Sequence, residues 1–358
     1  MAGAPLLEVR DLQVVFHTYA GLVQAVRGVS FAIAPGEMLA VVGESGCGKS
    51  VTAQTILRLL PTPPAEVTGG QILFEGRDLL KLSEREMQQV RGEQITVVFQ
   101  DPISALNPTA TVGSQIAEVV TLHESVTRKQ AWQRAVEMLQ LVGIPDAVQR
   151  AHQYPHQFSG GMRQRAMIAL ALACRPKLLI ADEPTTALDV TVQAQILALL
   201  KRLQKETGAA VLLITHDLGV VAEVADRVVV MYAGEVIEQA PLEPLFYAPR
   251  HPYTWGLLRS VPRLDRMRQG ALEPIEGTPP DLLDPPSGCA FAPRCRYALR
   301  ICRQMPPIEQ QVETEGHSVR CWLNDPAAPA GLRRPWAEGE AAVSQEDLSL
   351  QPRSAPPQ

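Results

Sequence analysis

The chain of 358 residues is 46% hydrophobic and 20% charged, and it has a formal net charge of −5 at pH 7. Its length favours one large domain with an extension, and its acidic balance excludes a general nucleic-acid binder, which would carry a basic surplus. The longest apolar run, at 166–174, is far shorter than the roughly 20 residues of a membrane-spanning helix. Because the N-terminus also lacks a signal-like pattern, we expect a cytosolic protein that can still dock on a membrane protein.

From residue 7 to about 233, short β-rich runs alternate with helical patterns. This alternation predicts an α/β fold with a parallel sheet flanked by helices. Three runs, "MLAVVG" at 38–43, "KLLIAD" at 177–182 and "AVLLITHD" at 210–217, are apolar on both faces. Central parallel strands have this pattern because helices cover both sides of their sheet.

A longer helical region lies between the first two of these strands. The stretch "LSEREMQQV" opens with a capping box formed by Ser83 and Glu86, and helical spacing returns at about 112–141. Beyond residue 251 the composition turns to proline and cysteine. After about residue 325 it is too polar and proline-rich to bury a core, so we expect residues 326–358 to be a disordered tail.

The run "GESGCGKS" at 43–50 has the G-x-x-x-x-G-K-[ST] spacing of a P-loop, directly after a strand and directly before a helical pattern. Its glycines let backbone N–H groups approach a phosphate, and the helix N-terminus adds free donors. A P-loop lysine reaches the β- and γ-phosphates of a nucleotide and the serine hydroxyl ligates Mg²⁺. The alternative, a glycine-rich turn with a chance match, does not explain the strand and helix around it. The predicted ATP-binding residues here are Gly43, Ser45, Gly46, Cys47, Gly48, Lys49, Ser50 and Val51.

A second strand, in "LLIADEP", ends in Asp182 and Glu183. Open α/β sheets bind ligands at the carboxyl ends of their parallel strands. We expect Asp182 to hold Mg²⁺ through water and Glu183 to act as general base on the attacking water. Taken alone, a strand that ends in Asp-Glu is more often just an exposed strand end, but the P-loop makes the catalytic interpretation stronger.

The stretch "FSGGMRQR" at 158–165 resembles the signature of ATP-binding-cassette ATPases, and it precedes the strand 177–182 as it does in that family. Gln100 in "VVFQDP" resembles the Q-loop, Asp189 in "ALD" the D-loop, and His216 in "ITHD" the switch histidine. The resemblance covers residues 7 to about 250. It implies a RecA-like P-loop core with a helical subdomain at about 90–172, together forming a nucleotide-binding domain at 1–250.

The resemblance also assigns roles to these residues. It implies that Ser159, Gly160 and Gly161 of one subunit close on the γ-phosphate held by the P-loop of another, although without its neighbours this stretch would be a plain capped helix start. At the next position Met162 replaces the glutamine of many family members, which leaves that side-chain contact open.

The resemblance implies three further contacts, to the nucleotide or to the Mg²⁺ and water beside it. His216 would hydrogen-bond the γ-phosphate, and Gln100 would contact Mg²⁺ or the attacking water and move with the helical subdomain. Without the other motifs, both would be ordinary polar residues. An aromatic residue would stack on adenine, for which Phe16 and Tyr19 both qualify and Tyr19 is preferred, although either could pack on the sheet.

Three stretches resemble one branch of the family, the ATP-binding subunits of dipeptide and oligopeptide importers. They are "VFQDPISALNP" at 98–108, "HPYT" at 251–254 and "IEGTPPDLL" at 275–283. The branch also handles nickel, opines and glutathione. The resemblance implies an extension at 251–325, and it makes "DPISALNP" a candidate docking groove for membrane subunits, where the residues alone indicate only a turn-rich connection.

Four of the six cysteines, Cys289, Cys295, Cys302 and Cys321, have the spacing C-x5-C-x6-C-x18-C within the extension. Disulfides are rare in a reducing cytosol, and a zinc site more typically shows a short C-x2–4-C pair. Four thiolates also fit a [4Fe-4S] cluster. Spacing alone leaves the cluster, zinc and unbound cysteines open, and the resemblance favours a structural cluster. Cys47 and Cys174 are expected to be small buried thiols.

We therefore expect an ATPase subunit that powers import of dipeptides or oligopeptides at the cytoplasmic face of the inner membrane. Its expected partners are two transmembrane permease subunits, a second related ATP-binding subunit and, through the complex, an extracytoplasmic solute-binding protein. The alternatives are a nickel, glutathione or opine importer of the same branch and, in a different class, a soluble ATPase of DNA repair or translation. Nothing in the ATP site encodes the cargo.

Overall fold

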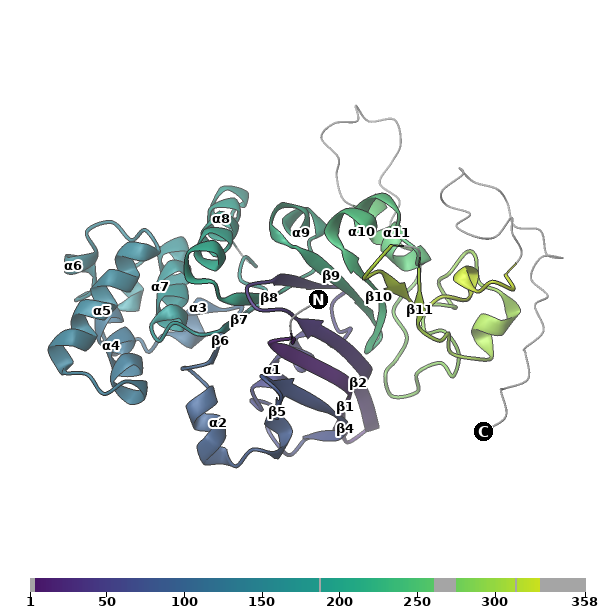
Figure 1. Cartoon of the computed structure of the whole chain (residues 1–358), viewed down its shortest axis with the longest axis horizontal. Coiled ribbons are helices and arrows are strands. Elements are labelled where there is room, and N and C mark those ends of the chain that lie inside the picture. The colour runs from purple at the N-terminus through teal and green to yellow at the C-terminus, as the bar shows by residue number, and fades with distance from the viewer. Residues whose placement is uncertain (1–3, 187, 261–274, 313, 329–358) are drawn as a thin grey trace.

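The computed structural model describes residues 4–186, 188–260, 275–312 and 314–328, and its elements are arranged around two sheets (Figure 1). The larger sheet has the strand order β11-β12-β10-β9-β3-β8-β7-β6. Five of its strands are parallel, which confirms the predicted α/β core: β3 (Met38–Val42), β6 (Ile95–Val98), β7 (Leu178–Asp182), β8 (Ala210–Thr215) and β9 (Arg227–Tyr232). Every residue of β3, β7 and β8 is buried, as expected for strands covered on both faces.

A second, antiparallel sheet of order β2-β1-β4-β5 lies beside the first. It consists of β1 (Leu7–Thr18), β2 (Gly21–Ile33), β4 (Ala65–Phe74) and β5 (Arg77–Asp78). The sequence interpretation did not separate these strands from the parallel core. Their buried residues, such as Leu7, Val14 and Ile33, alternate with more exposed ones and join one apolar core with β3 and β8. One buried face and one wet face are typical of an antiparallel sheet.

Helices cover both faces of the larger sheet, and α3 to α7 gather into a lobe at the left of Figure 1. The predicted capping box is confirmed, because the Ser83 hydroxyl accepts from the Glu86 N–H and the Glu86 carboxylate accepts from the Ser83 N–H. None of the described helices is both long and apolar enough to cross a bilayer. The α-helices are α1 (Lys49–Ile56), α2 (Glu84–Val90), α3 (Pro102–Ala105), α4 (Val112–His123), α5 (Arg128–Leu141), α6 (Ala147–Arg150), α7 (Gly160–Leu172), α8 (Val190–Thr207), α9 (Leu218–Val224), α10 (Leu242–Tyr247) and α11 (Pro252–Arg259).

The predicted extension packs against the far edge of the larger sheet, at the right of Figure 1. Its strands β11 (Gln310–Gln311) and β12 (Ser318–Val319) continue the sheet beyond β10 (Glu235–Pro241). Short 3₁₀ helices at 300–303 and 322–324 complete it, and two more lie at 79–81 and 155–157. The predicted disordered tail falls, from residue 329 onward, outside the described residues.

A buried carboxylate attaches this extension to the sheet. Glu238 of β10 is 1% exposed, and its oxygens accept from the N–H groups of Arg250 and His251 at 2.6 and 2.9 Å. The His317 Nε2 lies 2.8 Å from the same carboxylate and is equally buried. One side chain thus joins β10, the start of α11 and the segment before β12.

Replacing Glu238 with Ala should remove this anchor. Three buried N–H groups would lose their acceptor, and each unsatisfied buried donor costs about 1–3 kcal/mol, so the loss of unfolding free energy should be at least about 3 kcal/mol. Urea unfolding followed by tryptophan fluorescence measures it. The exposed Glu243→Ala at the start of α10 is the control and should change the value by less than about 0.5 kcal/mol. Equal midpoints for the two variants would contradict the anchoring role.

Candidate functional site

The loop between β3 and α1 has a backbone that only glycine accommodates. Gly43, Gly46 and Gly48 have φ values of 152°, 80° and 98°. A Cβ on Gly43 would lie 2.2 Å from the Met231 carbonyl oxygen, and one on Gly48 would lie 2.5 Å from the Ala25 carbonyl oxygen. The glycines at both ends of the loop therefore let it pack directly on neighbouring strands.

The helix that follows offers open donors to an anion. Helix α1 begins after Gly48, and no side chain caps its first turn. Its N-terminal N–H groups and dipole therefore remain available for a phosphate. Ser45 and Gly46 form the exposed tip of the loop, whereas Val51 points back onto the core.

Lys49 lies inside the loop rather than extending from it. Lys49 is only 5% exposed. Its ammonium donates to the carbonyls of Gly43 and Glu44 at 2.7 and 3.0 Å. The Cys47 sulfur lies 3.7 Å from the same Nζ, and burial raises the pKa of the Cys47 thiol. A buried cation beside free N–H groups makes the loop a strong site for a negatively charged group.

Two side chains whose oxygen atoms could bind a metal ion meet beside the P-loop. The Ser50 hydroxyl of α1 donates to the Asp182 carboxylate, at the end of β7, at 2.8 Å. Burial raises the pKa of Asp182, while the bond from Ser50 opposes that shift. Hydroxyl and carboxylate oxygens are the ligands that Mg²⁺ prefers, so this pair fits the predicted magnesium site.

Two of the other predicted catalytic side chains, Gln100 and His216, meet at Glu183. The Gln100 amide donates to its Oε2 at 3.1 Å, and the His216 Nδ1 lies 3.5 Å from its Oε1. The Thr186 hydroxyl, which the sequence interpretation missed, donates to the same Oε2 at 2.9 Å. Glu183 itself has φ 47°, a left-handed conformation rare for a non-glycine residue. These contacts orient the carboxylate, as a general base requires.

Other predicted residues lie away from this group. Ser159 is exposed and caps α7, with its hydroxyl accepting from the Met162 N–H at 3.4 Å, and Gly160 and Gly161 form the first turn. Helix α7 lies with the helical lobe, separate from α1 in Figure 1. The Ser-Gly-Gly stretch thus begins a helix, as predicted, but it does not join the P-loop of its own chain.

Asp189 and the two candidate aromatics have simple structural surroundings. Asp189 caps α8 through a bond from the Val192 N–H at 3.0 Å, while Ala187 lies outside the described residues. Tyr19 is fully exposed in the turn between β1 and β2, whereas Phe16 packs on the core. Tyr19 is therefore the more exposed of the two aromatics.

The four cysteines of the extension share one apolar cluster but form no ready metal site. All four are free, and they pack around Tyr297 and Leu299. Burial raises the pKa of Cys289 to about 12 and also raises the pKa values of the other three. Within the described residues, no three His, Cys, Asp or Glu side chains are grouped so that they could hold a metal ion. This arrangement therefore gives the predicted iron–sulfur site no support of its own, and the site stays a prediction.

Two protein families match parts of this chain. Residues 26–186 match "ABC transporter", and residues 237–302 match "Oligopeptide/dipeptide transporter, C-terminal region". The chain is 58% identical over 325 residues to the oligopeptide transport ATP-binding protein OppD of Bacillus subtilis, covering 90% of each chain. It is 57% identical over 323 residues to the dipeptide transport ATP-binding protein DppD of the same organism, covering 90% of this chain and 96% of the relative.

A solved structure shows the same cassette fold. The dimeric ATP-binding cassette MJ0796, in a post-hydrolysis state bound to ADP and Pi, superimposes with a TM-score of 0.59 at 28% identity. The match covers 66% of this chain and 98% of MJ0796.

Replacing Gly43 with Ala should disrupt the loop. The added Cβ would collide with the Met231 carbonyl and hold a strained φ, so we expect a loss of about 3 kcal/mol or more in unfolding free energy. Gly76 is a matched control, because it has φ 78° with nothing within 4 Å of an added Cβ. Gly76→Ala should cost only about 1 kcal/mol. Chemical denaturation compares the two, and equal losses would show that packing at Gly43 is not limiting.

Proposed function

This chain belongs to the ABC transporter family, among its peptide-transport ATP-binding subunits, and we propose that its P-loop site hydrolyses ATP to power peptide import. The observation that carries the proposed site is the meeting of Gln100, Thr186 and His216 at Glu183, next to the Ser50–Asp182 pair. A single oriented carboxylate beside a phosphate loop is what hydrolysis of a phosphoanhydride needs.

We assign phosphate binding to the loop and to Lys49. In the structure the Lys49 ammonium is held by two loop carbonyls, and the β- and γ-phosphates would take over these interactions. Ser50, Asp182 and Gln100 would hold Mg²⁺, which would neutralise charge that develops on the phosphates. Tyr19 would stack on adenine, because its ring is exposed where the β1–β2 turn ends.

Glu183 has the surroundings of a general base. Its carboxylate would accept a proton from water in line with the γ-phosphate, and Gln100 and Thr186 would hold its oxygens in place. His216 would contact the γ-phosphate from β8 and respond to its release. Catalysis in such a site comes mainly from positioning and electrostatics.

A second ATP-binding subunit would complete the site. The Ser159–Gly161 helix start is exposed and lies apart from the P-loop of its own chain, so it can act only on a nucleotide held by another subunit. The dimeric structure of MJ0796 supports this arrangement. We propose that Asp189 lies near the same interface and that the partner is a related but distinct ATP-binding chain.

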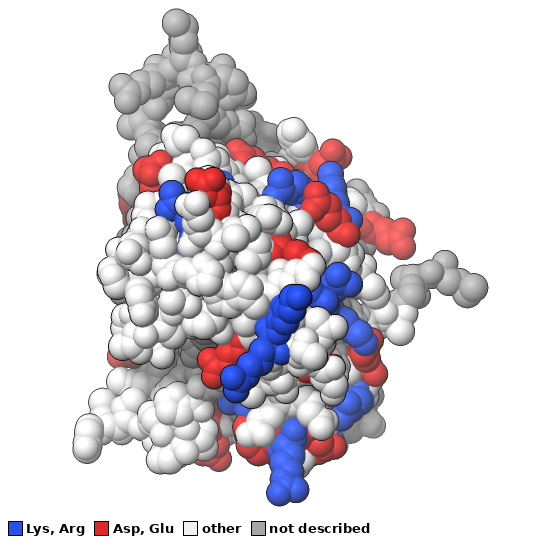
Figure 2. Space-filling model, turned by 90° about the vertical axis from the view of Figure 1, so that its left-hand side faces the viewer, with Lys and Arg blue, Asp and Glu red and all other residues white. Residues whose placement is uncertain are grey.

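The helical lobe is our candidate for contact with membrane-embedded permease subunits, with which ATP-binding subunits of this family work. Figure 2 shows that much of the lobe surface facing the viewer carries no charge. Exposed apolar side chains on this lobe include Leu122, Val148 and Tyr154. Large apolar side chains exposed on a surface with little charge are candidates for a protein contact. Docking would place the chain at the cytoplasmic face of the membrane, with a solute-binding protein on the other side of the complex.

We also propose that the four extension cysteines bind a structural [4Fe-4S] cluster. Two observations support it. All four are free thiols, and all four belong to one cluster in the extension. Iron would bind them as thiolates, because a coordinated thiol is deprotonated by the metal.

Anaerobically purified protein should then contain about four iron and four sulfide per chain. Cys302→Ser should lower both, while Cys174→Ser, outside the extension, should leave them unchanged. Elemental analysis and visible absorption report the content. Zinc in place of iron, or no metal in protein purified without oxygen, would rule out the cluster.

Import itself can be tested with two substitutions that separate ATP binding from hydrolysis. Lys49→Ala should abolish both, whereas Glu183→Gln should keep MgATP binding and lower turnover by about 10²–10⁴-fold. Cells that carry either variant on the chromosome should lose uptake of labelled dipeptides or of longer peptides. Retained uptake of both peptide classes and loss of nickel uptake would reassign the cargo. Turnover that survives Glu183→Gln would remove Glu183 as the base.

A further inference from the structure

Glu44, the second residue of the P-loop, is bonded through its backbone and side chain to four different groups, one of which is the Cys47 N–H of the same loop, 3.3 Å from its carbonyl oxygen. Its carbonyl accepts from the Lys49 ammonium at 3.0 Å. Its N–H donates to the Tyr253 hydroxyl at 2.9 Å, and its carboxylate accepts from both terminal nitrogens of Arg294 at 2.6 and 3.0 Å. Two of these partners belong to the C-terminal extension, about 210 and 250 residues away along the chain.

We propose that the C-terminal extension is a working part of the nucleotide site, in which Arg294 and Tyr253 are positioning residues that hold the P-loop through Glu44. This inference rests on the ATP site proposed above. It adds to that site two residues that contact neither the phosphates nor the catalytic carboxylate.

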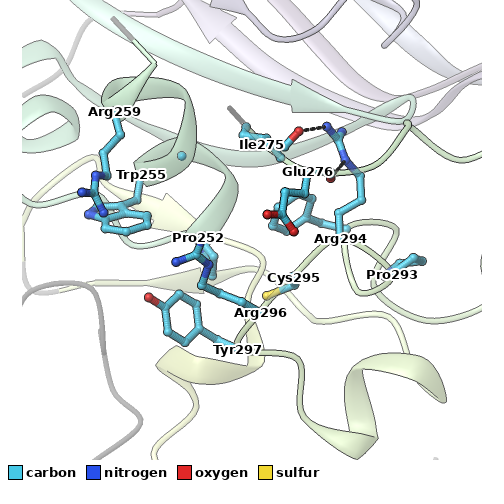
Figure 3. A pocket seen from close by; sticks show the side chains of 12 residues that line it. Pro252, Trp255, Arg259, Ile275, Glu276, Pro293, Arg294, Cys295, Arg296 and Tyr297 are labelled. Atoms are coloured by element: carbon cyan, nitrogen blue, oxygen red, sulfur yellow. Dashed lines mark hydrogen bonds between the residues drawn. The ribbon is translucent and has the colours of Figure 1, made fainter. Parts of the chain in front are cut away.

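The Arg294 guanidinium is oriented by the extension itself. Its Nε donates to the Glu276 carbonyl at 2.9 Å and one terminal nitrogen donates to the Ile275 carbonyl at 3.2 Å, as Figure 3 shows. The other terminal nitrogen of Arg294 donates to the Tyr232 hydroxyl at 3.3 Å. Together with the Glu44 carboxylate, these oxygen atoms accept from all the N–H groups of the Arg294 guanidinium. The Arg294 side chain is 5% exposed. A bidentate ion pair held in this way fixes the position of the Glu44 carboxylate and does not only neutralise its charge.

Tyr253 is held just as firmly. Burial lowers the pKa of His251 to about 3, so this imidazole is neutral, and its Nδ1 accepts from the Tyr253 N–H at 3.0 Å to cap α11. The Tyr253 ring packs against Tyr232 and Phe291, with centroids 4.7 and 5.4 Å away. The "HPYT" stretch thus serves to bring one hydroxyl to the loop backbone.

These contacts matter because Lys49 must leave the loop carbonyls when phosphate binds. At that moment the Glu44 carbonyl loses its bond from Lys49 and keeps only the longer one from the Cys47 N–H, at 3.3 Å, so the loop would be freer to change shape. The bonds from Tyr253 and Arg294 keep the Glu44 N–H and side chain in place. A phosphate binds with a smaller free-energy cost to a loop that already has its bound conformation than to a loop that must first be ordered.

A third contact joins the extension to the other side of the site. The Gln24 N–H in β2 donates to the Leu282 carbonyl at 2.9 Å, and Leu283 lies beside Gly21 in the turn that carries Tyr19. The extension therefore contacts both the phosphate loop and the turn expected near adenine. Since Arg294 precedes Cys295, any rearrangement of the cysteine segment would move the guanidinium that holds the loop.

The experiment compares Arg294→Met, Glu44→Gln and the double variant in the full-length protein, with MgATP binding and steady-state ATPase as readouts. We expect each single variant to raise the Kd and KM for MgATP about tenfold. The kcat should stay within about twofold, because the oriented carboxylate is untouched. The double variant should be no worse than either single one, since both remove the same interaction.

Arg227→Met is the matched control. It breaks a partly buried ion pair with Glu37, at 3.2 Å, at the opposite end of β3 and β9. It should lower thermal stability without changing KM. If Arg294→Met lowers stability to the same extent and leaves KM at the wild-type value, the pair is merely structural and the inference is wrong.

Two outcomes separate this inference from the proposed function. Wild-type protein that does not bind MgATP would refute the ATP site itself. If Arg294→Met fails to fold, Tyr253→Phe removes a single hydroxyl and tests the same idea, with an expected rise in KM of about threefold. An unchanged KM in folded Tyr253→Phe would overturn the role of the extension.

Discussion

The parallel register of the central strands is the constraint on which the site depends. The strands β3, β6, β7 and β8 run in one direction, so their carboxyl ends meet at one edge of the sheet. The P-loop follows the first, Gln100 the second, Asp182 and Glu183 end the third, and His216 follows the fourth. Residues as far apart as Ser50 and Asp182, 132 positions along the chain, therefore meet because their strands belong to one parallel sheet.

This constraint explains why much of the site could be predicted from the sequence. Each catalytic motif comes just after a short apolar run, and such a run indicates a buried parallel strand. The positions of Lys49, Ser50 and Glu183 at one sheet edge follow from that pattern. Thr186 could also have been found, because it lies three residues beyond Glu183, on the turn that leaves the strand.

Other features had no local signal. The antiparallel sheet depends on pairing of β1 with β4 across more than 40 residues, and its alternating burial is interrupted by bulges. The Arg294–Glu44 pair joins residues 250 positions apart, and either residue alone resembles an ordinary surface charge. Long-range pairs of this kind depend on how the extension docks, which periodicity does not describe. The cysteines illustrate the opposite limit, since their spacing suggested ligands while the described side chains form no group of three that could hold a metal ion.

The extension can influence the P-loop only because it is fixed at more than one place. Glu238 holds the start of α11 and the segment before β12 on the sheet, and the aromatic group of Tyr232, Tyr253 and Phe291 fills the space between sheet and loop. A segment tethered at one point would rotate around it, and its side chains would not keep a bidentate geometry. Because the extension is held at the sheet edge and at the loop, we expect it to move with the P-loop as one body. Forces that reach it from a partner subunit would therefore act on the backbone that binds phosphate.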